Sequence, residues 1–344
     1  MRFMAVTKIL LAFVVLFWGP QAFSQTLKIA TIAPEGSAWM KDMRAGAEVI
    51  KSETQGRVNL KFYGGGVQGN DKQVQRKMRT GQLHGGAFTS GGMNGFQVDA
   101  DLFTLPLMFN TLEEARFVRE QMEPELRRRL EQAGYINFGF AAAGFAYMMS
   151  NKPMSSQADF DGQKIWTPEG DEVSYEALRS LGVAPVIMPV TDVMTGLQTD
   201  LLDSVAVPPV GAVVFQWHTK LKYITNLPVA YVYAALLIDK KAFFKLSADD
   251  QNIVREVMEG IYRKFEQNGK TDYVNALQAL LDSGMQMVDP APGVMDQWRK
   301  IVYQSHYKLA SEGVFDLELL EQMQRLLDEY RSGNGSVTMT AKDS

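Results

Sequence analysis

The sequence predicts an α/β fold with two lobes. Its 344 residues, 46% of them hydrophobic, are enough for two packed globular units. Over Asp161–Pro209, short β-rich pieces alternate with amphipathic helical runs, and glycine or proline stands at the joints. This alternation is typical of parallel strands with crossover helices, whose ligands bind beyond the carboxyl ends of the strands. Trp166 and Val207 are predicted to lie at two of those ends.

The first 24 residues predict a cleaved signal peptide and export to the periplasm. Arg2 and Lys8 accompany an apolar core at Ile9–Trp18, and Ala22–Ser24 offers the small residues that a signal peptidase recognises. The alternative is a membrane anchor, but the apolar run is shorter than the roughly 20 residues that a membrane span needs. We therefore expect the mature chain to begin near Gln25.

Composition argues against several classes of function. The net charge is −4, and the longest basic run, Arg127–Arg129, has acidic neighbours, which argues against nucleic-acid binding. The chain has no cysteine, and its three histidines are scattered without metal-ligand spacing. There is no Gly-x-Ser-x-Gly elbow, and the triple glycine at 64–66 lacks the spacing of a phosphate loop. We predict no enzyme activity, no metal and no cofactor.

The first half of the chain predicts three strands and two helices that frame a cleft. Strands are expected at 27–31 and 57–63, and residues 85–92 are expected to be a strand that runs into a glycine-rich loop. Helices are expected from Ser37 to about 52 and from Thr111 to about 132. Trp39, in the first helical turn, is either a cleft wall residue or part of the core. Candidate floor residues stand where the third strand enters a glycine-rich loop that lets a ligand approach the backbone. They are Phe88, Thr89 and Ser90.

The second half predicts strands that cross between the lobes and a long helix. The apolar run 136–150 and the strand 227–238 are expected to cross. Ser247 caps a helix that continues with helical apolar spacing until the proline-rich turn at 289–293, and a final helical pair reaches about 330. We predict a first lobe of residues 25–146 plus 236–283, a second lobe of residues 147–235 plus 284–330, and a flexible tail at 331–344.

The motif at 161–209 resembles the extracytoplasmic solute-binding proteins of TRAP transporters, the DctP family. It has Gly162, Lys164 and Pro168 in the family spacing, followed by a helix, by Leu-Gly-x-x-Pro-Val and by a helix with Leu-Gln-x-x-x-x-Asp at its end. The resemblance covers nearly the whole mature chain. It implies a type II, periplasmic-binding-protein-like fold with hinge strands and a long helix that braces both lobes. It also implies capture of a solute in the cleft, hinge closure and delivery to a TRAP membrane permease.

The chain departs from the family at three binding positions. Many relatives clamp a carboxylate with an arginine at the position of Trp166, often with a second arginine at Ala146 and an asparagine at Val207. Burying a carboxylate without a paired cation costs several kcal/mol, so an ordinary organic acid should bind poorly here. We predict an apolar or amphipathic ligand. Some relatives without the arginine are associated with a tetratricopeptide-repeat partner, and the resemblance implies such a partner as a candidate for this chain.

Two alternatives stay open. Trp166 either contacts ligand or plugs the cleft, and a relocated arginine clamp would restore an organic-acid receptor, although Arg44, Arg57, Arg76 and Arg179 lie in segments that read as surface. An occluded cleft would instead favour an interaction or sensor protein. The remaining candidate wall residues are aromatic side chains and a methionine. They are Phe145, Tyr147, Met188, Phe215 and Tyr231.

Overall fold

The computed structural model describes residues 24–96 and 99–333. The predicted signal peptide therefore lies outside the described residues except for Ser24, as does the end of the predicted tail from residue 334. Within the described ranges, no helix combines the length and the apolar character needed to cross a membrane.

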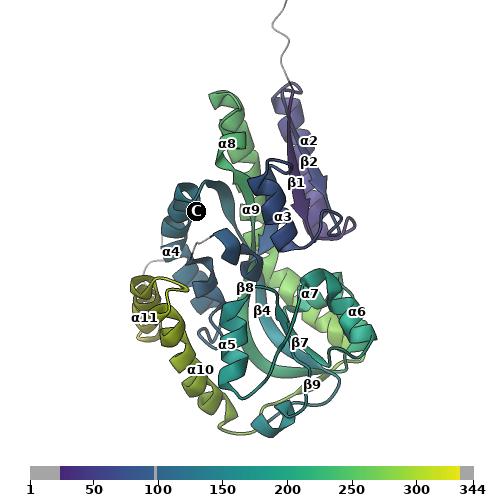
Figure 1. The fold of residues 1–344 in the computed structure, drawn as a ribbon, viewed down its shortest axis with the longest axis vertical. Helices are drawn as coiled ribbons and strands as arrows, with labels where there is room; N and C mark the ends of the chain where they lie inside the picture. Colours follow the sequence, from purple (N-terminus) through teal and green to yellow (C-terminus); the bar gives the residue numbers. More distant parts are fainter. Residues whose placement is uncertain (1–23, 97–98, 334–344) are drawn as a thin grey trace, which may run out of the picture.

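The first lobe is built on three parallel strands. β1 (Gln25–Thr31) lies between β2 (Val58–Tyr63) and β3 (Gly85–Thr89). Helix α2 (Ala38–Glu53) begins where the Ser37 hydroxyl accepts a hydrogen bond from the Met40 amide, and its buried face repeats every three or four residues. Helix α3 (Asp71–Arg79) follows β2, and Figure 1 shows both helices beside these strands.

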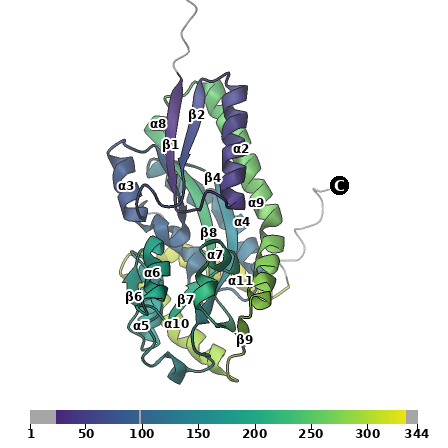
Figure 2. The same cartoon turned by 90° about the vertical axis from the view of Figure 1, so that its right-hand side faces the viewer.

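Two long antiparallel strands run through the whole molecule. β4 (Tyr135–Ser150) and β8 (Tyr223–Asp239) pair along most of their length, and both pass from one lobe to the other in Figures 1 and 2. At one end β8 pairs with β3, and at the other end β4 pairs with β7 (Ser204–Val207). The register shifts four times along the β4–β8 pair. The predicted crossing strands are confirmed, and irregular pairing bends them between the lobes.

The second lobe confirms the strand–helix alternation predicted for 161–209. β5 (Trp166–Pro168) pairs in parallel with β6 (Val186–Met188), and α5 (Glu172–Ser180) connects them. α6 (Val193–Gln198) leads to β7, and α7 (Pro209–Val214) follows β7. Val207 ends its strand as predicted. Trp166 instead begins β5, so its predicted place at the carboxyl end is wrong, and Pro168 takes that end.

Helix α9 (Ala248–Asp282) braces both lobes. Its 35 residues contact α2 in the first lobe, and β4 and α7 toward the second. It ends at Asp282, before the predicted proline-rich turn, because a short strand, β9 (Gln286–Val288), follows and pairs in parallel with β8. The mixed α/β, two-lobe fold is thus the predicted type. We keep the predicted lobe boundaries as a proposal.

The remaining helices cover the flanks. α4 (Leu112–Gln132) packs against β4 and against α11 (Leu317–Arg331), and α10 (Val294–Ser311) packs against α5. α8 (Lys240–Phe243) is a single turn after β8. Arg331, expected to begin a flexible tail, is the last residue of α11 and forms an ion pair with Glu114 at 2.9 Å.

Candidate functional site

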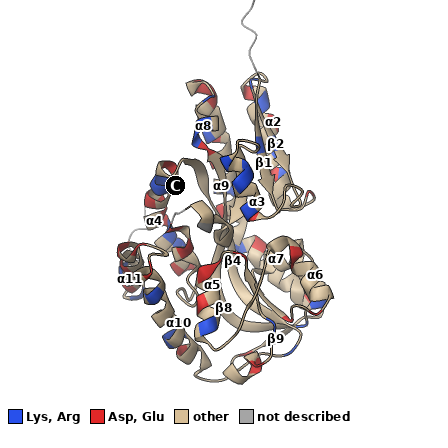
Figure 3. Cartoon of the chain, viewed as in Figure 1, with Lys and Arg blue, Asp and Glu red and all other residues tan. Residues whose placement is uncertain are grey.

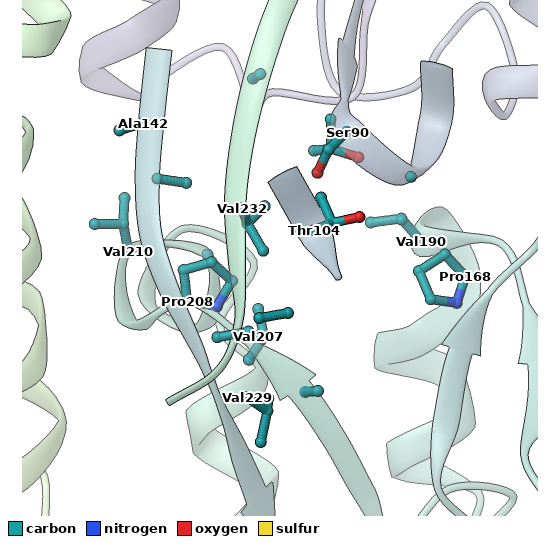
Figure 4. Close-up of a pocket in the computed structure, with 18 of the residues that line it drawn as sticks. Ser90, Thr104, Ala142, Pro168, Val190, Val207, Pro208, Val210, Val229 and Val232 are labelled. Atoms are coloured by element: carbon teal, nitrogen blue, oxygen red, sulfur yellow. The ribbon is translucent and has the colours of Figure 1, made fainter. Parts of the chain in front are cut away.

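A cavity of about 670 Å³ lies between the lobes and is bounded by both crossing strands. This volume is in the range of small-molecule binding sites. Figure 4 shows the wall from one side, with Ser90 and Thr104 together on one flank, Pro168 and Val190 on another, and Val207 and Val229 below. The strands β4 and β7 that form its floor carry no charged residue, and their ribbons are uniformly tan in Figure 3.

The cavity continues from the cleft into the core of the second lobe. Met154, Phe160 and Trp298 line this inner part, and all three belong to the buried hydrophobic cluster of that lobe. Leu227 from β8 and Val302 from α10 line it as well. The inner part is therefore an apolar extension that lies between the crossing strands and helices α5 and α10.

Trp166 lines the cleft while being held firmly in place. Its side chain is only 6% exposed, and its indole Nε1 donates a hydrogen bond to the Met188 carbonyl at 2.8 Å. The Trp217 ring meets it edge to face at a centroid distance of 5.3 Å, and Phe215 stacks on Trp217. Trp166 thus forms an aromatic wall with its neighbours, on one side of the cavity.

Eight of the twelve predicted site residues line the cavity, and four do not. The eight are Trp39, Phe88, Thr89, Ser90, Ala146, Trp166, Val207 and Phe215. The four outside the wall are Phe145, Tyr147, Met188 and Tyr231.

Strand geometry explains two of these exceptions, Phe145 and Tyr147. Successive side chains of a strand point to opposite faces, so when Ala146 on β4 faces the cavity, Phe145 and Tyr147 face away. Phe145 packs against Tyr231 at a ring distance of 6.0 Å, and the Tyr147 hydroxyl accepts a hydrogen bond from the Tyr273 hydroxyl at 2.6 Å. Met188 contributes only its carbonyl, as the acceptor for Trp166.

Sequence reasoning missed several wall residues. Alternation from Ala146 would have indicated Met148 on β4, since residues two apart share a face. No sequence signal indicated Trp298 and Val302, because α10 reaches the cavity only through tertiary packing. Asp171 was also missed, because it reads as an ordinary helix cap before α5.

No arginine lines the cavity among the residues that the structure describes. Arg44 and Arg57 form ion pairs with Glu35 and Asp250 on the outside of the first lobe. Arg119 is buried, at 3% exposure, but it lies outside the cavity wall, donates to the Phe140 carbonyl and pairs with acidic residues of α4 and α9. The described residues therefore contain no relocated arginine clamp.

Asp171 is the only charged side chain of the described wall that is buried. Its Oδ1 accepts a hydrogen bond from the Ser174 amide at 2.9 Å and so caps α5. Burial raises the pKa of Asp171, and hydrogen bonds from the first turn of α5 oppose this shift. The other charged wall residues, which lie at the rim, are Lys41, Asp42, Lys264 and Asp272, and the Lys264 ammonium pairs with Asp42 at 2.7 Å.

Comparison with known proteins gives one consistent result. A family model described as "Bacterial extracellular solute-binding protein, family 7" matches residues 29–312. The C4-dicarboxylate-binding periplasmic protein DctP of Rhodobacter capsulatus is 25% identical over 240 residues, which cover 69% of this chain and 72% of that protein.

Solved structures match over almost their whole length. A TRAP periplasmic solute-binding protein from Desulfovibrio salexigens, with bound orotic acid, has a TM-score of 0.80 at 18% identity and covers 89% of this chain and 99% of its own. A TRAP periplasmic solute-binding protein from Sulfurospirillum deleyianum, with bound succinate, has a TM-score of 0.80 at 17% identity. The match covers 88% of this chain and 99% of that protein. These structures share the fold of this chain.

Proposed function

We propose a ligand class for this chain, which belongs to the bacterial extracellular solute-binding proteins of family 7. Proteins of this family are receptors and not enzymes. The chain is accordingly a periplasmic solute-binding receptor of the TRAP type, which binds a small molecule and works with membrane permease subunits. Its ligand is apolar or amphipathic, and it is captured in the cleft between the lobes.

The composition of the cavity wall carries this proposal. Trp166, Ala146 and Val207 all line the cavity, at the three positions where the family pattern places polar or cationic groups. A carboxylate placed there would lose its hydration without gaining a cation, at a cost of several kcal/mol. Each 100 Å² of apolar ligand surface that such a wall covers contributes about 2.5 kcal/mol instead.

The apolar extension into the second lobe supports a ligand with an elongated apolar part. Met154 and Phe160 offer that part apolar surface, and Trp298 adds an indole whose buried Nε1 has no hydrogen-bond partner among the described residues. A compact dicarboxylate would leave this space unfilled, whereas an alkyl chain or a fused ring system would fill it.

The second candidate function is an organic-acid receptor, which the orotate and succinate bound to the similar structures favour.

Native mass spectrometry of protein purified from the periplasm tests the proposal. We expect an apolar or amphipathic molecule to be released by organic extraction. A thermal-shift comparison then sets decanol against succinate and orotate, and we expect decanol alone to raise the unfolding temperature. A co-purified organic acid, or stabilisation by succinate or orotate without stabilisation by decanol, would overturn the apolar assignment and favour the second candidate.

Trp166→Arg sharpens this test, with Trp166→Phe as the matched control. The arginine variant should lose decanol binding and gain succinate binding, because it restores the cation of the family pattern. The phenylalanine variant keeps an aromatic wall and loses only the hydrogen bond to the Met188 carbonyl. It should therefore keep the wild-type preference.

Two further parts of the proposal rest on the sequence alone. We propose that residues 1–24 are removed on export, and the intact mass of the periplasmic protein tests this cleavage.

We also propose a tetratricopeptide-repeat partner, as the resemblance implies for some members without the arginine. Cross-linking in the periplasm, followed by identification of the linked proteins, should recover that partner, and a linked set without any such repeat would contradict it.

A further inference from the structure

One end of the apolar cavity carries an acidic group that the proposed function does not use. Asp171 lines the wall beside the turn after β3, and its Oδ2 lies 3.4 Å from the position that a Cβ on Gly91 would take. Ser90 and Thr104 line the same end. This end therefore carries the buried acidic group, while the rest of the enclosed wall is mainly apolar and includes the buried hydroxyl groups of Thr31 and Thr225.

The surroundings of Asp171 add negative charge and no buried cation. Asp101 is buried near enough to Asp171 for their charges to interact, and its Oδ1 has no hydrogen-bond partner among the described residues. Asp71 faces the neighbouring Gly92 of the same turn. None of these three carboxyl groups has a basic side chain within 4.0 Å in the described ranges, and the nearby Lys72 pairs with Glu169.

Helix capping does not account for this arrangement. Asparagine or serine would cap α5 as well as aspartate and would avoid burying a charge. The capping bond from the Ser174 amide goes to Oδ1, while Oδ2 is the carboxylate oxygen nearest to Gly91. A metal ion does not account for it either, since no group of three or more possible ligands is assembled in the described residues. An organic cation fits better, because one carboxylate and two hydroxyl groups suit an ammonium with several donors.

We propose that the ligand carries a protonated amine or a similar cationic nitrogen, which Asp171 binds with the hydroxyl groups of Ser90 and Thr104 beside it. The apolar remainder of the ligand lies along Trp166 and Val207 and enters the extension in the second lobe. This inference rests on the proposed function, because it names the polar group of the same amphipathic ligand. Pairing with an ammonium removes the unfavourable burial of an uncompensated carboxylate, so the head group adds both affinity and orientation.

A head-group series with a constant decyl chain tests the inference. Decylammonium, decanol and decanoate are compared by calorimetry at neutral pH, below the concentrations at which they form micelles. We expect wild-type protein to bind decylammonium at least about 10-fold more tightly than decanol, and decanoate most weakly. A tenfold difference corresponds to about 1.4 kcal/mol.

Asp171→Asn keeps the cap of α5 and removes the charge, so the affinity ratio of decylammonium to decanol should fall to near one. Asp239→Asn is the matched control. Asp239 caps α8 through a hydrogen bond from the Ala242 amide and does not line the cavity, so its variant should keep the wild-type ratio.

The outcomes separate this inference from the proposed function. Equal affinities of decylammonium and decanol for wild-type protein would overturn the cationic head group and leave the apolar cleft standing. An unchanged ratio in Asp171→Asn would overturn the role of Asp171. Binding of succinate without binding of any decyl compound would overturn the proposed function itself. If Asp171→Asn fails to fold, the head-group ranking of the wild-type protein still decides whether the ligand is cationic.

Discussion

Buried ionisable side chains make the stability of this protein depend on pH, and His306 on α10 is a clear case. It is 1% exposed, and its ring lies 5.3 Å from the ring of Tyr303. Burial lowers the pKa of His306 from 6.5 to about 4, because the charged imidazolium would lose its hydration, and the backbone of Pro106 partly opposes this shift. The folded protein therefore holds His306 neutral under mildly acidic conditions.

The sign of the resulting pH dependence follows from proton binding. Between about pH 6.5 and about pH 4 the unfolded chain binds a proton at His306 that the folded chain does not, so the free energy of unfolding falls as the pH is lowered. The stabilisation that comes from holding His306 neutral is fully present above about pH 6.5. At pH 4 the free energy of unfolding has fallen by about 3 kcal/mol through this group. Urea unfolding over this range should show the free energy of unfolding of wild type falling, relative to that of His306→Phe, as the pH is lowered. A constant difference would assign the pH dependence to other groups.

Single residues also show where sequence reasoning about the site succeeds. Trp166 lines the cavity as the motif predicts, because Gly162, Lys164 and Pro168 fix the register around it. Asp171 escaped notice because a capping aspartate and a ligand-facing aspartate look alike in sequence. A ligand-facing aspartate differs from a capping one in its burial. Asp171 is buried against the turn at Gly91, which lies eighty positions earlier in the chain, so the local sequence does not reveal it.

At the scale of elements, the crossing strands depend on glycines that let them bend against α9. Gly144 on β4 has a φ of +89°, and a Cβ there would lie 2.4 Å from the ring of Tyr273 on α9. Gly134, just before β4, has a similar φ of +96° but open space around its Cβ position. The two glycines share the backbone conformation and differ in the space available.

Gly144→Ala should therefore destabilise the protein more than Gly134→Ala. Both variants lose about 1–3 kcal/mol through an unfavourable φ. Gly144→Ala adds the displacement of the Tyr273 ring, which costs about another 1–3 kcal/mol by analogy with overpacked cores. Urea unfolding of both variants measures the difference directly. Equal losses would mean that α9 moves aside without cost, and would count against its role as a rigid brace.

Element-scale features divide into those that local sequence determines and those that it does not. The long helix α9 and the alternation in 161–209 were predictable, since helical spacing, caps and turn residues are local signals. The strand β9 was not, because three residues carry no periodicity and Gln286–Val288 becomes a strand only by pairing with β8. The bulges that decide which face of β4 meets the cavity also arise from pairing with β8.

At the scale of the whole molecule, polar contacts join the two lobes beside the cleft. The Glu169 carboxylate follows β5 in the second lobe. It accepts hydrogen bonds from the Lys72 ammonium at 3.0 Å and from the Asn70 amide at 3.3 Å, both at the start of α3 in the first lobe. The loop after β2 also approaches the second lobe, since a Cβ on Gly66 would lie 3.0 Å from Thr191. We expect these contacts to hold the two lobes together beside the cleft.

Glu169→Gln should therefore favour opening of the cleft. Exposed ion pairs contribute about 0.5 kcal/mol, so ligand dissociation should become about 2-fold faster, and high salt should have the same effect on wild type. Stopped-flow tryptophan fluorescence measures the rate, since Trp166 and Trp217 line the cavity. Glu176→Gln is the matched control, because its ion pair with Lys308 at 2.8 Å has similar exposure and joins α5 to α10 within the second lobe. Equal acceleration in both variants would show that the contact between the lobes does not control opening, and that loss of a surface carboxylate alone speeds release.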